Sequence, residues 1–200
     1  AAIKGSTSLA VSNIMGSNIF NTLVIIGVAA MIYPITVKNN TTFKEIPFSM
    51  LAALVLGICA LDLWVDGGTV NQLTRSDGLI FLAFFIIFMY YSFQMMKTGK
   101  AEEEPVKELP VFTSGLFILS GVGGLFIGGR WIVNGAIRIA SDAGMSEAMI
   151  GVTIVAVATS LPELVTSIVA ARKKQSGIAI GNAIGSNIFN IFLVLGVSAV

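Results

Sequence analysis

The hexapeptide GSNIFN occupies residues 16–21 and occurs again, without a change, at residues 185–190. By composition alone, an exact six-residue match in a chain this short is about a one-in-a-thousand event. The correspondence extends outward, because the same offset of 169 residues (from 16 to 185) also aligns Asn13 with Asn182. We therefore interpret the two segments as copies of one structural unit, which makes them an internal repeat.

The composition is typical of a membrane protein. Apolar residues make up 55% of the chain and charged residues only 12%, and the mean hydropathy is +0.88. Soluble proteins average about 25% charged residues. Six apolar runs are each long enough to cross a hydrocarbon core about 30 Å thick as a helix. They cover residues 12–33, 47–65, 77–96, 109–140, 148–171 and 178–200. The predicted fold class is all-α, a polytopic transmembrane helical bundle.

Five predicted crossings separate corresponding points of the two GSNIFN copies. Because five is an odd number, the copies are expected to run in opposite directions through the bilayer, as inverted-topology repeats. We divide the chain into a first half with three spans (1–96), a linker (97–108) and a second half with three spans (109–200). Most lysines and arginines lie on the linker's side of the membrane, which predicts that the linker is cytoplasmic.

Charge, histidine and cysteine content exclude several functions. The net charge is +1 and no basic stripe is present, so a nucleic-acid partner is not expected. The absence of histidine excludes a histidine-based metal site or proton relay. A single cysteine, Cys59, lies inside an apolar run and rules out a disulfide framework. An intramembrane enzyme is disfavoured as well, because no paired intramembrane aspartates accompany these absences.

Each repeat copy presents a polar stripe at helical spacing. Residues four apart lie along one helix face, and this spacing holds for Asn13, Ser17, Asn21 and again for Asn182, Ser186, Asn190. Such side chains could simply join membrane helices by hydrogen bonds, and Gly177, Gly181 and Gly185 could serve close packing. For the serines and asparagines we favour a cation site, because neutral oxygens suit hard cations and the set occurs in both halves.

The fifth predicted span carries one ionisable residue, Glu163. A carboxylate in mid-membrane costs about 2.5 to 3.5 kcal/mol, so an ion or proton pathway is its usual explanation. Pro162 has no amide hydrogen and frees the carbonyl four residues back, and Thr159 and Ser160 add two hydroxyls. This all-oxygen environment favours Na⁺ and Ca²⁺. The alternative is a structural kink in which a neighbouring asparagine or Arg130 satisfies the acid.

Two motifs carry a specific resemblance. TSLPEL at residues 159–164 and GNAIGSNIFN at residues 181–190 resemble the second alpha repeat of the calcium/cation antiporter superfamily, and most closely its prokaryotic sodium/calcium exchangers. The resemblance implies ten helices, a four-helix site shared by both halves, and alternating access in which Na⁺ and Ca²⁺ compete. By the same correspondence, this chain resembles helices three to eight of ten, a truncated exchanger fold.

The resemblance also implies roles for individual residues. Glu163 resembles the carboxylate shared by Na⁺ and Ca²⁺, and Thr159 a calcium-coordinating residue. The sodium ligands are matched by Ser160, Ser186, Ser17 and the carbonyl of Ala156, and the central positions by Asn21 and Asn190. Some relatives carry Asp in place of Asn190, and Gly is frequent in place of Ala158, so ion preference and potassium dependence stay open.

Under this correspondence the second carboxylate of the site falls before Ala1, so the 200-residue chain alone is expected not to transport. The expected partners are the lipid bilayer, the transported Ca²⁺ and Na⁺, the missing helices and, through uncovered polar stripes, a second copy of the fragment. The expected location is a prokaryotic inner (plasma) membrane. A Ca²⁺(cation)/H⁺ antiporter remains the alternative function, because Glu163 could carry a proton in one half-cycle.

Overall fold

The computed structural model describes residues 7–37, 41–65, 67, 71–97, 109–145, 147–150, 153–154 and 156–200. Within these ranges the regular structure is helical and no strand occurs. The first half contains α1 (Thr7–Phe20), η2 (Asn21–Ile25), α2 (Ile26–Ile32), η3 (Thr41–Glu45), α3 (Ile46–Ala60), α4 (Asp62–Val65) and α5 (Arg75–Lys97). The second half contains α6 (Val111–Asp142), α7 (Glu147–Ile150), α8 (Ala156–Thr159), α9 (Leu161–Arg172), α10 (Ser176–Phe189), η5 (Asn190–Leu195) and α11 (Gly196–Ala199). The segments η2, η3 and η5 are π-helical.

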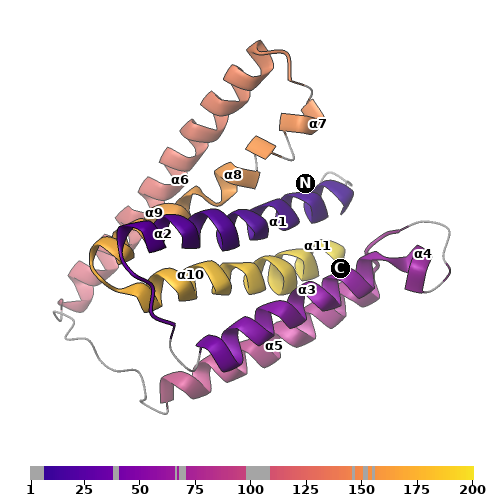
Figure 1. Ribbon diagram of the computed structural model, residues 1–200, viewed down its shortest axis with the longest axis horizontal. Helices are drawn as coiled ribbons and strands as arrows, with labels where there is room; N and C mark the ends of the chain where they lie inside the picture. Colours follow the sequence, from indigo (N-terminus) through magenta and orange to yellow (C-terminus); the bar gives the residue numbers. More distant parts are fainter. Residues whose placement is uncertain are drawn as a thin grey trace.

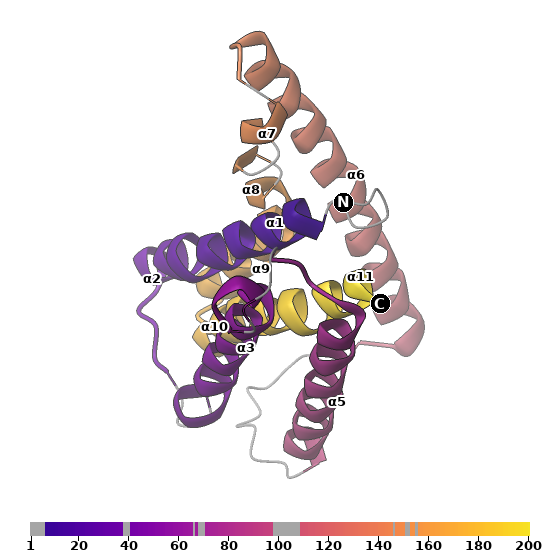
Figure 2. The ribbon, with the colours of Figure 1, turned by 90° about the vertical axis from the view of Figure 1, so that its right-hand side faces the viewer.

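The two repeat copies form the centre of the molecule. The rod α1–η2–α2 lies beside the rod α10–η5–α11, and the two run in opposite directions in both ribbon views (Figures 1 and 2). Their π-helical segments begin at Asn21 and Asn190, which are equivalent positions of the repeat. The prediction of an all-α bundle with inverted-topology repeats is confirmed.

Five helices of the described chain are long and apolar enough to cross a membrane. They are Ala10–Ile32, Thr41–Ala60, Arg75–Met95, Val111–Asp142 and Ser176–Ala199. The run at residues 148–171 differs from the expectation of a sixth such helix, because it is divided among α7, α8 and α9. Broken helices of this kind are found at the binding sites of secondary transporters.

The break between α8 and α9 has a local cause in the sequence. Ser160 leaves helical geometry, with φ −96° and ψ 2°, and Pro162 stands in the first turn of α9. Proline is tolerated in a first turn because an amide hydrogen there has no intrahelical acceptor. The sequence Ser160-Leu161-Pro162 therefore ends one helix and starts the next in the middle of an apolar segment.

Aromatic packing fixes α3 and α5 against the second repeat copy. The ring of Phe192, on η5, is fully buried, stacks on Phe84 with centroids 5.4 Å apart, and meets Phe48 edge-on at 6.0 Å. Nearby, α5 and α11 approach closely at two glycines. A Cβ at Gly78 would lie 2.9 Å from the carbonyl oxygen of Gly196, and one at Gly196 would lie 3.0 Å from Leu82.

The outer surface is apolar, as a bilayer requires. Helix α6 has one buried residue, Ala140, among those described, and its large side chains such as Phe112 and Trp131 are exposed. The chain is therefore an integral membrane protein, and lipid is its surrounding partner. The linker expected at residues 97–108 lies outside the described residues apart from Lys97, so the division at that point stays a prediction.

Candidate functional site

Three of the predicted ligands meet where α1 crosses the broken helix. The hydroxyl of Ser17 donates to the carbonyl oxygen of Ala156 at 3.1 Å and lies 3.0 Å from Oγ1 of Thr159. Thr159 Oγ1 in turn donates to the Ala156 carbonyl at 2.9 Å. Ser17 is only 4% exposed, so these oxygens form a buried triangle contributed by both halves of the chain.

Glu163 follows one turn later on α9, in the first turn of that helix. Its Oε2 atom is buried and has no hydrogen-bond partner among the described residues. The side-chain amide of Asn182, on α10, donates to the backbone oxygen of Glu163 at 3.0 Å and not to its carboxylate. Arg130 is exposed and no ion pair with Glu163 is formed in the described structure. The kink interpretation, in which an asparagine or Arg130 satisfies the acid, therefore finds no support.

The two predicted amide ligands are placed differently from the hydroxyls. Asn21 is fully buried, and its Nδ2 donates to Oδ1 of Asn187 at 3.1 Å. The other end of that amide, Oδ1, is buried without a partner in the described part of the chain. Asn190 is half-buried, and its Nδ2 donates to Oδ1 of Asn18 at 3.0 Å. Both amide ligands are thus held by the opposite copy of GSNIFN.

The remaining predicted ligands are Ser160 and Ser186. Ser160 is 2% exposed and sits at the break between α8 and α9, next to Thr159. Ser186 is half-buried on α10, and none of the hydrogen bonds described here joins it to another predicted ligand. The structure therefore joins Ser17, Thr159 and Ala156 directly, whereas the two serines are placed on the same elements without such a contact.

The polar centre was only partly visible in the sequence. Asn18 and Asn187 bind the amide ligands, yet they were not among the predicted site residues. The available signal was their position inside the repeated hexapeptide, one residue after Ser17 and Ser186. They lie off the i, i+4 stripe that drew attention to the ligands, so helical spacing pointed away from them.

The described residues contain no group of three or more His, Cys, Asp or Glu side chains that could hold a metal ion. A cation at this place would be bound by one carboxylate and several neutral oxygens. Such a set suits Na⁺ and Ca²⁺, which take oxygen ligands, and does not suit metals that prefer nitrogen or sulfur.

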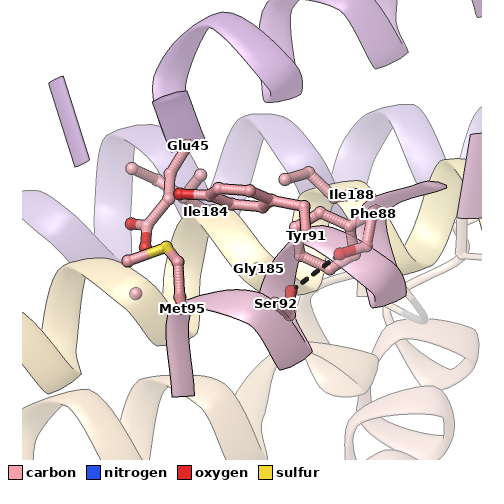
Figure 3. Close-up of a pocket in the computed structure, with 9 residues that line it drawn as sticks. Glu45, Phe88, Tyr91, Ser92, Met95, Ile184, Gly185 and Ile188 are labelled. Atoms are coloured by element: carbon pink, nitrogen blue, oxygen red, sulfur yellow. Dashed lines mark hydrogen bonds between the residues drawn. The ribbon is translucent and has the colours of Figure 1, made fainter. Parts of the chain in front are cut away.

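A separate cavity of about 210 Å³ lies between η3, α5 and α10 (Figure 3). Its lining includes the carboxylate of Glu45, the ring of Tyr91 and Gly185, and none of the predicted cation ligands. A Cβ at Gly177, Gly181 or Gly185 would meet no atom within 4 Å. In the described structure this glycine ladder is therefore not the close-packing surface that the sequence suggested, and two of its members face the cavity.

Comparisons with known proteins agree with this geometry. The family described as "Sodium/calcium exchanger protein" matches residues 1–94 and 113–200. The chain is 36% identical to the "Putative antiporter CaxA" of Alkalimonas amylolytica and 37% identical to the "Inner membrane protein YrbG" of Escherichia coli K12. These alignments cover 100% of the chain but 63% and 62% of the two relatives.

Solved structures give the same result. The sodium-calcium exchanger NCX_Mj, in a structure soaked with Na⁺ and Sr²⁺, matches with a TM-score of 0.76 and 32% identity. That match covers 100% of this chain and 62% of the exchanger, and another structure of the match is described as the exchanger from Methanococcus jannaschii. The chain spans less than two thirds of the length of these relatives. With both halves matched by its profile, the chain belongs to the sodium/calcium exchanger protein family.

Proposed function

We propose that the protein acts as a secondary active antiporter that exchanges Na⁺ for Ca²⁺ by alternating access. One observation carries the proposal. Oε2 of Glu163 and Oδ1 of Asn21 are buried oxygens that find no donor among the described residues. Buried acceptors without a donor are costly, and a cation is a partner that would satisfy both of them.

The hydroxyl triangle supports the same assignment. Ser17 and Thr159 bond to each other and to the carbonyl of Ala156 in the absence of a cation. A Na⁺ ion at this place could replace these bonds with ion–oxygen contacts, because both hydroxyls can turn their hydrogens away. Ser160 and Ser186 are proposed as further sodium ligands, and Asn190 as the counterpart of Asn21.

Charge balance places the carboxylate at the centre of exchange. One Glu163 carboxylate neutralises a single Na⁺ but only half the charge of Ca²⁺, so Ca²⁺ needs further negative charge in a low-dielectric site. We propose that the rest of this charge comes from outside the 200 residues, and that the isolated chain does not transport. Ion flux from the purified 200-residue chain in liposomes would overturn that part of the proposal.

Alternating access requires an element that opens the site to one side at a time. Helix α6 contacts α8 and α9, the two segments that carry Thr159 and Glu163. It extends past them as a long exposed rod (Figure 1). We propose that α6 is the moving gate, since a smooth, glycine-rich helix can slide over the polar centre without carrying a ligand itself.

A Ca²⁺(cation)/H⁺ antiporter is the second candidate. The observation in its favour is that the site contributes one ionisable group, Glu163, whose unpartnered oxygen could accept a proton. The two functions differ in the counter-ion, because a proton carrier works without Na⁺.

The test is uptake of ⁴⁵Ca²⁺ into vesicles that contain the protein at its full natural length. An imposed outward Na⁺ gradient is expected to drive uptake, and Glu163→Gln is expected to abolish it. Glu45→Gln is the matched control, because Glu45 lies at the separate cavity (Figure 3). Uptake that follows a proton gradient instead would select the second candidate, and no uptake under either gradient would refute both.

A further inference from the structure

The two copies of GSNIFN exchange a pair of equivalent hydrogen bonds. Asn21 donates through Nδ2 to Oδ1 of Asn187 at 3.1 Å, and Asn190 donates through Nδ2 to Oδ1 of Asn18 at 3.0 Å. Asn21 corresponds to Asn190, and Asn18 corresponds to Asn187, under the offset of 169 residues that separates Asn18 from Asn187. The second bond is therefore the image of the first under the repeat symmetry.

The acceptors of these bonds are themselves held in place. Nδ2 of Asn18 donates to the backbone oxygen of Asn187 at 3.3 Å. Nδ2 of Asn187 donates to the hydroxyl of Thr22 at 2.9 Å, and Thr22 Oγ1 donates to the backbone oxygen of Asn18 at 2.8 Å. Because both Nδ2 groups are engaged, Asn18 and Asn187 must present their Oδ1 atoms to the opposite copy.

This arrangement decides which end of each amide ligand is left for an ion. A free asparagine can present either its oxygen or its NH₂ group, which differ by a rotation of the amide. The NH₂ group carries positive partial charge and repels a cation. In Asn21 the NH₂ group is consumed by Asn187, and the buried Oδ1 has no partner among the described residues.

We propose that Asn18 and Asn187 are positioning residues for the cation site, each fixing the amide of the ligand asparagine in the opposite repeat so that its oxygen faces the ion. This inference rests on the proposed function, because it needs Asn21 and Asn190 to serve the cation. It assigns a role to two residues that touch no ion. It also explains a geometric feature, since each held asparagine starts a π-helical turn, a form of helix often found at functional sites.

A packing role would make a different prediction. If Asn18 and Asn187 only filled space between α1 and α10, their loss would lower stability equally with and without cations. If they orient amides, their loss acts through the partner ligand. Coupling should then follow the crossed pairs, Asn187 with Asn21 and Asn18 with Asn190, and not the neighbours within one helix.

The experiment is a set of double-mutant cycles in the protein at its full natural length. The readouts are KM and Vmax for Na⁺ in ⁴⁵Ca²⁺ exchange and the rise in melting temperature on adding Na⁺ or Ca²⁺. Asn187→Ala is expected to raise KM for Na⁺ by about three- to tenfold with little change in Vmax, as for loss of one buried hydrogen bond. In an Asn21→Ala background the same change is expected to have no further effect on KM.

A bypass variant keeps the test informative if the alanine variants fold poorly. Aspartate at position 21 has two equivalent oxygens and no NH₂ group to misplace. In an Asn21→Asp background, Asn187→Ala should therefore leave KM for Na⁺ unchanged, and Asn190→Asp should do the same for Asn18→Ala.

Additive effects on KM in both crossed pairs, or an unchanged cation-induced rise in melting temperature, would overturn the positioning role alone. Absence of Na⁺-driven uptake by the unaltered protein would overturn the proposed function together with it. The two failures are distinguishable because the first is seen in a protein that still transports.

Discussion

Asn182 binds the backbone of Glu163, since its Nδ2 lies 3.0 Å from the Glu163 carbonyl oxygen. The same Nδ2 also donates to the hydroxyl of Ser167 at 3.0 Å, which joins α10 to α9 beside the carboxylate. The repeat counterpart, Asn13, has a buried Oδ1 without a partner in the described chain. Asn182 therefore helps to fix the position of the site's one carboxylate, although it contacts only its main chain.

Replacement of Asn182 by leucine is expected to lower stability by about 1–3 kcal/mol, because two buried acceptors lose their donor. The same change should reduce Na⁺-driven ⁴⁵Ca²⁺ uptake by displacing Glu163. Both effects can be measured on one preparation, by thermal unfolding in detergent and by vesicle uptake. Asn134→Leu, at an exposed position of α6, is the matched control and should alter neither. Equal results for the two variants would contradict the role given to Asn182.

Loss of the Ser17 hydroxyl should affect Na⁺ more than Ca²⁺. Ser17 bonds to Ala156 and Thr159, so alanine at this position removes one of three clustered oxygens. We expect KM for Na⁺ to rise about tenfold in Ser17→Ala, which corresponds to about 1.4 kcal/mol, while Ca²⁺/Ca²⁺ exchange is largely retained. Ser120→Ala on α6 is the control, because its hydroxyl bonds only to the Phe117 carbonyl of its own helix. Equal losses of Na⁺- and Ca²⁺-dependent flux would count against a sodium-selective role.

The repeat and the single acid were enough to predict the fold class and the centre of the site. GSNIFN and TSLPEL brought Ser17 and Thr159 into one expectation, and the structure places their oxygens 3.0 Å apart. The division of the run at 148–171 was signalled only in part. Pro162 indicated a disturbed helix, but the apolar composition of the run gave no sign of separate pieces.

The crossed asparagine bonds could not be predicted from the sequence. They depend on how far α1 and α10 are rotated about their own axes, and a repeat specifies the two helices without specifying their mutual rotation. The same limitation applies to glycines. The spacing of Gly181 and Gly185 suggested close packing, yet the tight approach occurs at Gly78 and Gly196, which share no motif. Which glycines pack depends on which helices are neighbours.

A second acid in the polar centre should change ion preference. Asn190→Asp would add a negative charge at a position whose amide now donates to Asn18. Because Coulomb attraction scales with ion charge, Ca²⁺ gains more than Na⁺ from this carboxylate. We expect the ratio of Ca²⁺ to Na⁺ affinity to rise about tenfold or more, measured by competition of Na⁺ with ⁴⁵Ca²⁺ binding. Asn134→Asp on α6 adds the same charge at an exposed site and should leave the ratio unchanged. A fall in the ratio for Asn190→Asp would place Asn190 outside the cation site.

Two Gly→Ala substitutions should change stability in opposite directions. A Cβ at Gly78 would lie 2.9 Å from the Cβ of Ala199 and from a backbone oxygen, and a contact with backbone cannot relax cheaply. Gly78→Ala is therefore expected to destabilise by about 1–3 kcal/mol through overpacking between α5 and α11. A Cβ at Gly181 meets nothing within 4 Å, so Gly181→Ala gains helix propensity, worth about 0.5–1 kcal/mol, and should stabilise. Thermal unfolding of both variants at full natural length decides the matter. If Gly181→Ala were the more damaging change, the surface beside Gly181 would have to be packed against another segment, and the glycine ladder would regain its interpretation as a helix-packing face.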